Sequence, residues 1–186
     1  RGALAARMTM LLGGPTADGI PLVSGQWDFE AGNLVATVGT DIVPRTDTEF
    51  VTTFETAVLD DGVANVMHFA YPGGTTPAEN QARVPLGYIF PHGVLANGGG
   101  EKVNQYSVIM DIMFPSTSGG FRSLFQVGTN NDSARDIFLN SANGLGISSQ
   151  YQGSVTPDAF HRVVFTLDLT KRELGKYIDG VTVVTV

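Results

Sequence analysis

The densest group of oxygen-bearing side chains in the sequence lies in a single polar run. Asn130, Asn131, Asp132 and Asp136 place amide and carboxylate oxygens within seven residues. Calcium is bound in proteins by six to eight oxygens of this kind, so the run is a candidate calcium site. Asn and Asp also bond their own backbone in turns, and ordinary turn chemistry is therefore the alternative interpretation.

A second group has the residue types that recognise sugars. A pyranose has one apolar face and a rim of hydroxyls, so its sites combine an aromatic ring with amides and charged groups. Tyr151 lies between polar residues in SSQYQGS, and Asp111, Arg122, Gln126 and Asn140 lie on expected strands. Either these residues form one polar face that binds a glycan, or they only solvate an outer sheet.

Other residues with possible chemistry favour structural roles. Asp28, Glu30 and Asn33 form a second acidic loop, for which turn chemistry is again the alternative to calcium. Trp27 alternates with apolar neighbours in QWDFE, which favours the core. His161 stands at the expected start of a strand, where we expect it to hydrogen-bond an edge or a loop.

Several catalytic patterns are missing from the sequence. It has no phosphate-binding or dinucleotide glycine motif, no HExxH and no GxSxG, and it contains no cysteine. Retaining glycosidases need two carboxylates about 5–5.5 Å apart, which on a strand means acids at i, i+2 or i+4. No expected strand has such a pair. We therefore expect a protein that is not an enzyme.

The composition excludes further classes. The chain has 186 residues, of which 42% are hydrophobic and 16% charged, with a net charge of −7. Binding to nucleic acid requires a basic face, which this sequence lacks. No apolar run approaches the roughly 20 residues that span a bilayer. The length fits one domain.

The pattern from residue 20 onward has period two, which predicts strands, and 23 Gly with 9 Pro indicate many turns. Asp179-Gly180 between two alternating runs is a strong hairpin signal. The spacing predicts an antiparallel sandwich or jelly roll. Strands are expected at residues 34–38, 49–54, 63–70, 86–90, 106–114, 121–127, 136–140, 145–148, 161–169, 174–178 and 181–186.

The first residues have a different spacing. Leu4, Met8, Leu11 and Leu12 fall at i, i+4, i+7 and i+8, which predicts a short amphipathic helix over residues 2–12. Two glycines and Pro15 would end it. We expect this helix to be the one helical element of the chain.

The runs YSVIMDIMFP, SLFQV, DIFLN, GLGIS, TPDAFHRVVFTLDL and KYIDGVTV resemble the laminin-G-like branch of the concanavalin A-like lectin/glucanase superfamily. WDFEAGNLVATVG resembles the opening strand of such modules. The resemblance covers about residues 24–186, although Phe160 stands where the family usually has Trp. It implies an all-β, two-sheet antiparallel jelly-roll sandwich in a secreted, multidomain bacterial protein. The E-x-D-x-x-E strand of the family's hydrolases is missing, which implies a binding role.

The resemblance also bears on domain organisation. Residues 1–23 resemble the tail of a preceding module, and residues 24–186 resemble a jelly-roll domain that lacks its last strands. We therefore expect a segment of a tandem array, or a subunit whose sheet another copy completes.

Three functions remain open for this sequence, the third being an accessory domain of a hydrolase encoded elsewhere in the full chain. The leading hypothesis is a non-catalytic extracellular or cell-surface module that binds polysaccharide or a surface glycan. The alternative is a structural repeat or self-assembling subunit of a fibre, sheath or adhesin. The run VTVVTV at residues 181–186 is apolar or β-branched on both faces, and its outer edge has no obvious partner. It predicts head-to-tail association of copies.

Overall fold

The computed structural model of the chain describes residues 3–15, 21–45, 51–59, 62–70, 87–116, 119–127 and 136–185. Over these residues the protein is all-β, and none of them lies in a helix. The strands form several antiparallel sheets in a β-sandwich-like arrangement, as the alternation of the sequence predicts.

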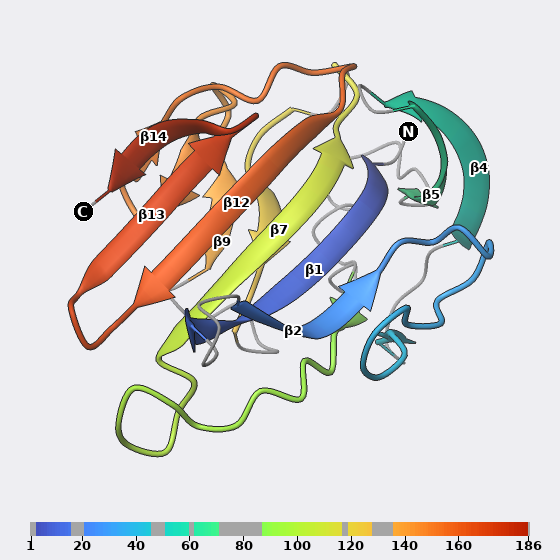
Figure 1. Ribbon diagram of the computed structural model, residues 1–186. Coiled ribbons are helices and arrows are strands. Elements are labelled where there is room, and N and C mark those ends of the chain that lie inside the picture. Colours follow the sequence, from blue (N-terminus) through green and yellow to red (C-terminus); the bar gives the residue numbers. More distant parts are fainter. Residues whose placement is uncertain are drawn as a thin grey trace.

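The largest sheet has eight strands, of which seven follow the order β14-β13-β12-β7-β1-β5-β4 while β2 pairs with β1 (Figure 1). Its strands are β1 (Ala3–Pro15), β2 (Pro21–Trp27), β4 (Val51–Leu59), β5 (Gly62–Ala70), β7 (Gln105–Met113), β12 (His161–Asp168), β13 (Glu173–Ile178) and β14 (Val181–Thr185).

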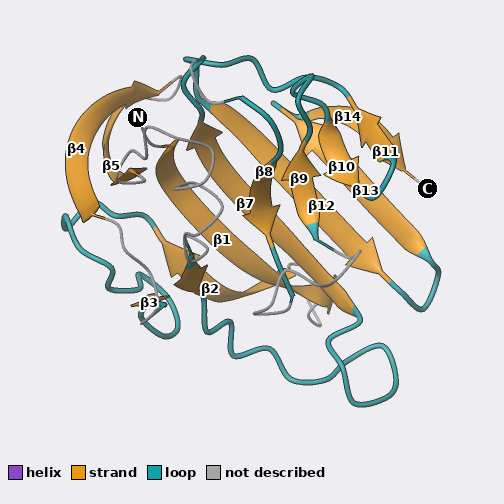
Figure 2. Ribbon diagram, turned by 180° about the vertical axis from the view of Figure 1, so that it is seen from behind, coloured by secondary structure: helices purple, strands orange, loops and turns teal. Residues whose placement is uncertain are grey.

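A smaller sheet covers one face of the large one (Figure 2). It has four strands in the order β11-β10-β9-β8. Their bounds are Arg122–Phe125 for β8, Ile137–Leu139 for β9, Leu145–Ile147 for β10 and Gln150–Gln152 for β11. The short strands β3 (Val43–Pro44) and β6 (Tyr88–Ile89) pair with each other.

One apolar core lies between the two larger sheets. Alternate residues of the long strands supply one side of it, as period-two burial requires. Trp27 is fully buried there, which confirms its expected core role, and its Nε1 donates to the Thr40 carbonyl over 3.0 Å. The central members are Met8, Trp27, Val108, Met110, Ile112, Ile137, Leu139, Leu145, Val163 and Phe165.

The expected N-terminal helix is wrong, because residues 3–15 form the strand β1. β1 pairs with β7 on one side, and with β5 and β2 on the other. Met8, one of the four residues that suggested the helix, is buried opposite Met110. The backbone groups of this segment are thus bonded by the next strand, β2, and by β5 and β7, which are distant in the sequence, and this pairing overrides a local helical spacing.

The division into residues 1–23 and 24–186 stays a prediction.

Most of the expected strands are present. β4, β5, β7, β12, β13 and β14 overlap the runs expected for them, and the expected runs at 86–90, 121–127, 136–140 and 145–148 contain β6, β8, β9 and β10. The expected strand at residues 34–38 is wrong, since only Val38 forms an isolated bridge, with Gln26. Strands β2, β3 and β11 were not expected. Asp179 and Gly180 both have positive φ, which confirms the predicted hairpin turn.

Candidate functional site

The outer face of the small sheet presents a row of aromatic rings. Phe138 stands between the buried Ile137 and Leu139, so its side chain points away from the core. Gly146 pairs with Phe138 on one side and with Tyr151 on the other. Phe138 and Tyr151 therefore share the outer face, with a glycine between them.

Phe121 completes this row from the loop before β8. Its side chain is 64% exposed. Its ring centroid lies 5.8 Å from that of Tyr151 and 6.5 Å from that of Phe138, with interplanar angles of 71° and 81°. These are edge-to-face contacts, a favoured geometry for aromatic pairs. We call Phe121, Phe138 and Tyr151 the aromatic row.

Of the five residues expected to bind glycan, Asn140 lies beside Tyr151. A Cβ placed on Gly144 would stand 3.3 Å from both Asn140 Oδ1 and Tyr151 Cβ, so this glycine allows the two side chains to approach. Asn140 Oδ1 accepts from the backbone N–H groups of Ala142 and Gly144 over 3.0 and 2.8 Å. Within the described residues its Nδ2 has no partner, which leaves that amide group to donate to a ligand.

Arg122 lies next to Asn140 but faces the interior. It is paired with the buried Leu139, and its guanidinium lies 5.4 Å from the centre of the Phe114 ring. Its Nη2 donates to the Asn140 carbonyl over 3.0 Å and to Asn143 Oδ1. Burial lowers the pKa of Arg122. The arginine thus holds the β9–β10 turn rather than presenting its charge on the outer face.

The remaining two expected glycan ligands are bonded elsewhere. Gln126 Nε2 donates to Asp136 Oδ2 over 3.1 Å. Asp111 lies on the outer face of the large sheet, where Arg162 Nε and Nη2 donate to its two oxygens, each over 2.7 Å. Asp111 and Tyr151 therefore stand on different sheets, and the five residues do not share one polar face.

For the expected calcium loop, the structure describes one residue of four. Asp136 is 2% exposed, and its Oδ1 has no hydrogen-bond partner within the described part of the chain. Asn130, Asn131 and Asp132 lie outside the described residues. No three His, Asp or Glu residues gather as a metal site within the described ranges. The calcium site stays a prediction.

In the second acidic loop the oxygens bond within the protein. Asp28 accepts from the backbone N–H of Glu30 and from the Thr37 hydroxyl, over 3.3 and 2.5 Å. Asn33 Oδ1 accepts from the Val35 N–H over 3.0 Å. These contacts are turn chemistry, the alternative interpretation of this loop.

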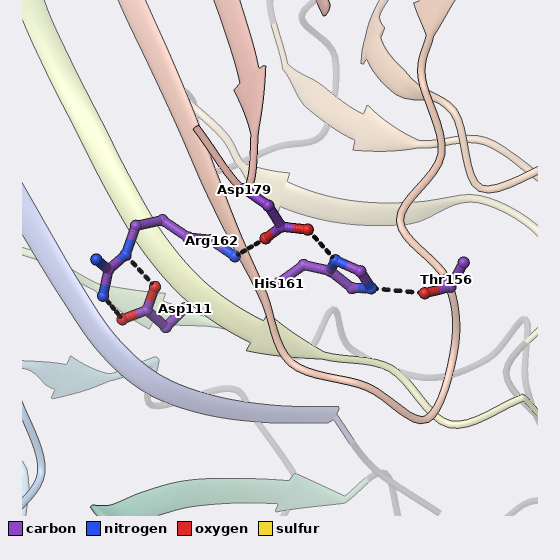
Figure 3. Close-up of polar contacts among 5 residues, drawn as sticks. All are labelled: Asp111, Thr156, His161, Arg162 and Asp179. Atoms are coloured by element: carbon purple, nitrogen blue, oxygen red, sulfur yellow. Dashed lines mark hydrogen bonds and ion pairs between the residues drawn. The ribbon is translucent and has the colours of Figure 1, made fainter. Parts of the chain in front are cut away.

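A polar chain runs across the start of β12 (Figure 3). His161 Nδ1 lies 2.6 Å from Asp179 Oδ2, and its Nε2 lies 2.7 Å from the Thr156 hydroxyl. Asp179 Oδ1 accepts from the Arg162 N–H over 2.9 Å. The histidine thus joins a loop to the β13–β14 turn, which confirms its expected bonding role.

Thr156, His161 and Asp179 follow the order hydroxyl, imidazole, carboxylate that nucleophilic triads use. With the carboxylate as acceptor, His161 Nδ1 donates to Asp179, and its Nε2 faces the Thr156 hydroxyl. Among the described residues, the hydrogen bonds of these three side chains tie one segment to another. The role that these hydrogen bonds support is therefore to position the β13–β14 hairpin turn.

Sequence reasoning missed Phe121 and Phe138, because it weighed only Trp and Tyr as ligand-binding rings. The signal for Phe138 was its place between Ile137 and Leu139 in a short alternating strand. Phe121 gave no such local signal, because its exposure depends on the course of the chain before β8.

Comparison with known proteins assigns no family to the chain. No family model matches it, and neither a characterised protein nor a solved structure shows significant similarity. Within the described residues, no helix has the length and apolar character needed to cross a bilayer.

Proposed function

We propose that this protein is a non-catalytic recognition module that binds polysaccharide or a surface glycan through the aromatic row. The observation that carries the proposal is Phe121, a large apolar ring that is 64% exposed and flanked by two further rings. Exposed apolar patches on soluble proteins mark binding surfaces. A sugar would place its apolar face on these rings.

The surroundings of the aromatic row favour an uncharged sugar. Asn140 offers an amide donor beside Tyr151, while Arg122 is bonded toward the interior. Binding sites of this kind combine apolar contact with a few polar groups that fix the orientation of the ligand. The expected ligand is therefore a neutral polysaccharide.

We further propose a laminin-G-like jelly roll of the concanavalin A-like type, exported to the extracellular space or cell surface. What supports this is that the runs that carry the resemblance contain strands of both larger sheets, β7, β12, β13 and β14 in one and β8, β9 and β10 in the other. The absence of the family's hydrolase motif supports a role in binding.

The aromatic row is tested by removing its rings. We expect native gels containing laminarin, barley β-glucan, xylan or galactomannan to retard the wild-type protein with at least one polymer. Phe121→Ala and Tyr151→Ala should each weaken that binding about tenfold, because each ring loses its stacking contact. The exposed Leu95, changed to Ala, is the matched control and should bind as the wild type does. A wild type that none of these polymers retards would contradict the proposal.

A second candidate function rests on a different observation. β14 and β4 are the two end strands of the seven-strand path through the large sheet, and within the described residues neither pairs on its outer side. Open edges can be completed by another chain. This observation supports a self-assembling structural subunit, in which an edge strand of one copy pairs with an edge strand of the next.

A further inference from the structure

Lys176 is a charged residue inside the core of the sandwich. It lies on β13, pairs with Phe165 of β12, and is 1% exposed. A lysine is almost never buried to this degree unless its ammonium is bonded. Its partners therefore show what the residue does.

All the partners of the ammonium belong to one hairpin of the opposite sheet. Nζ donates to the carbonyls of Leu145 and Gln150 over 3.2 and 3.0 Å, and to Gln152 Oε1. An ammonium has three donors, and each has a neutral acceptor here. Burial lowers the pKa of Lys176, so holding the charge in this place carries a cost that the three bonds offset.

The same hairpin carries the tyrosine of the aromatic row. Gln150 and Gln152 flank Tyr151 in β11, and Tyr151 points to the outer face while Gln152 reaches inward to the lysine. β11 has three residues and is the edge strand of its sheet, paired only with β10 among the described strands. Short hairpins of this kind are marginally stable by themselves.

We infer that Lys176 is a positioning residue for Tyr151, reaching across the sandwich to hold the β10–β11 hairpin so that the tyrosine stays against Phe121. The consequence for ligand binding rests on the proposed function. The consequence for the position of Tyr151 does not, and it can be measured without a ligand.

The first measurement uses the protein labelled with 3-fluorotyrosine, with the Tyr151 resonance assigned by Tyr151→Phe. In Lys176→Met, which keeps the length of the side chain but has no donor, we expect the Tyr151 resonance to shift while that of Tyr106 stays in place. Amide exchange in residues 145–152 should rise about tenfold, the effect of losing charge-assisted hydrogen bonds. Lys171, exposed on the β12–β13 turn, gives the matched control Lys171→Met, which should change neither.

A second pair of variants covers the case in which Lys176→Met unfolds as a whole. Gln152→Glu gives the ammonium a charged acceptor and should slow exchange in the hairpin. Gln152→Leu removes one acceptor and should speed exchange there. If neither changes hairpin exchange, or if Lys176→Met leaves both the Tyr151 resonance and the exchange as in the wild type, the inference is overturned.

The binding arm uses the same polysaccharide gels. Where the wild type is retarded, Lys176→Met should bind about tenfold more weakly and Lys171→Met should not. Unchanged binding by a variant with a loosened hairpin would overturn the link to ligand binding. Where no polymer retards the wild type, the proposed function fails, while the resonance and exchange data still decide the role of Lys176.

Discussion

Within the described part of the chain, three charged residues are buried, and each has a different set of hydrogen-bond partners. Asp111 has a bidentate arginine, the strongest geometry for a carboxylate. Lys176 has three neutral oxygens. Among the residues that the structure describes, Asp136 has a hydrogen-bond partner at one of its two oxygens. A buried unpaired oxygen costs free energy, so a cation bound at Asp136 would stabilise the folded state.

The oxygen of Asp136 that has no hydrogen-bond partner among the described residues gives a prediction. In chelator, Asp136→Asn should be more stable than the wild type by about 1 kcal/mol, because a neutral amide costs less to bury than a half-paired carboxylate. If the loop of residues 130–136 binds calcium, the ion should raise the unfolding temperature of the wild type and leave that of the variant unchanged. Thermal unfolding with calcium, magnesium and EDTA measures both effects.

Asp28→Asn is the control, because its loop bonds within the protein. An Asp136→Asn variant that is less stable than the wild type in chelator, together with no effect of calcium on the wild type, would show that Asp136 has a purely structural role.

Some elements of the fold form because of contacts between neighbouring residues, and others because they pair with strands that are distant in the sequence. The β12–β13 turn is controlled locally by Asp168. Its Oδ1 accepts from the Thr170 hydroxyl and N–H over 2.5 and 3.0 Å, and its Oδ2 accepts from Gln105 Nε2 over 3.0 Å. These bonds, that of the Thr170 hydroxyl above all, hold the pKa of Asp168 well below its ordinary value of 3.8.

The low pKa predicts a pH dependence of stability. A carboxyl whose pKa is lower in the folded state stabilises the protein above its unfolded pKa, and the contribution is lost as pH falls toward the folded pKa. The wild type should therefore be more stable than Asp168→Asn at pH 7, and the difference should shrink below about pH 4. Urea unfolding from pH 7 to pH 3 measures it, with the exposed Glu101→Gln as control. A difference that is the same at every pH would contradict this account.

The sequence predicted the elements whose signals are local, and it failed for those that depend on distant parts of the chain. The turn at Asp179-Gly180 and the strands β7 and β12 were predicted because their signals lie within a few neighbouring residues. β1 was predicted as a helix because Leu4, Met8 and Leu12 fit a helical face. Its residues pair with residues of β5 and β7 that lie more than fifty positions later, and only β2 is a near neighbour in the sequence. At the candidate site, Tyr151 was identified by its polar neighbours, but Phe121 reaches it only through the folded chain.

For the whole molecule, the arrangement of the large sheet constrains how copies could associate. Each of the six neighbouring pairs from β14 to β4 is antiparallel, so the two edge strands run in the same direction. Head-to-tail addition of copies in the same orientation would therefore pair β14 with β4 in parallel. Association about a two-fold axis would pair β14 with β14, or β4 with β4, in antiparallel fashion.

The predicted head-to-tail association can be tested with one lysine on each edge, since edge lysines block strand pairing. Val181 on β14 and Val58 on β4 are both exposed, at 67% and 77%. In sedimentation experiments the wild type should form growing chains as concentration rises, while Val181→Lys and Val58→Lys should each stay monomeric. An equimolar mixture of the two variants should form dimers and nothing larger, because each variant keeps the edge that the other lacks. Two-fold pairing would instead leave one variant dimeric by itself, and a wild type that stays monomeric at high concentration would contradict self-association of either kind.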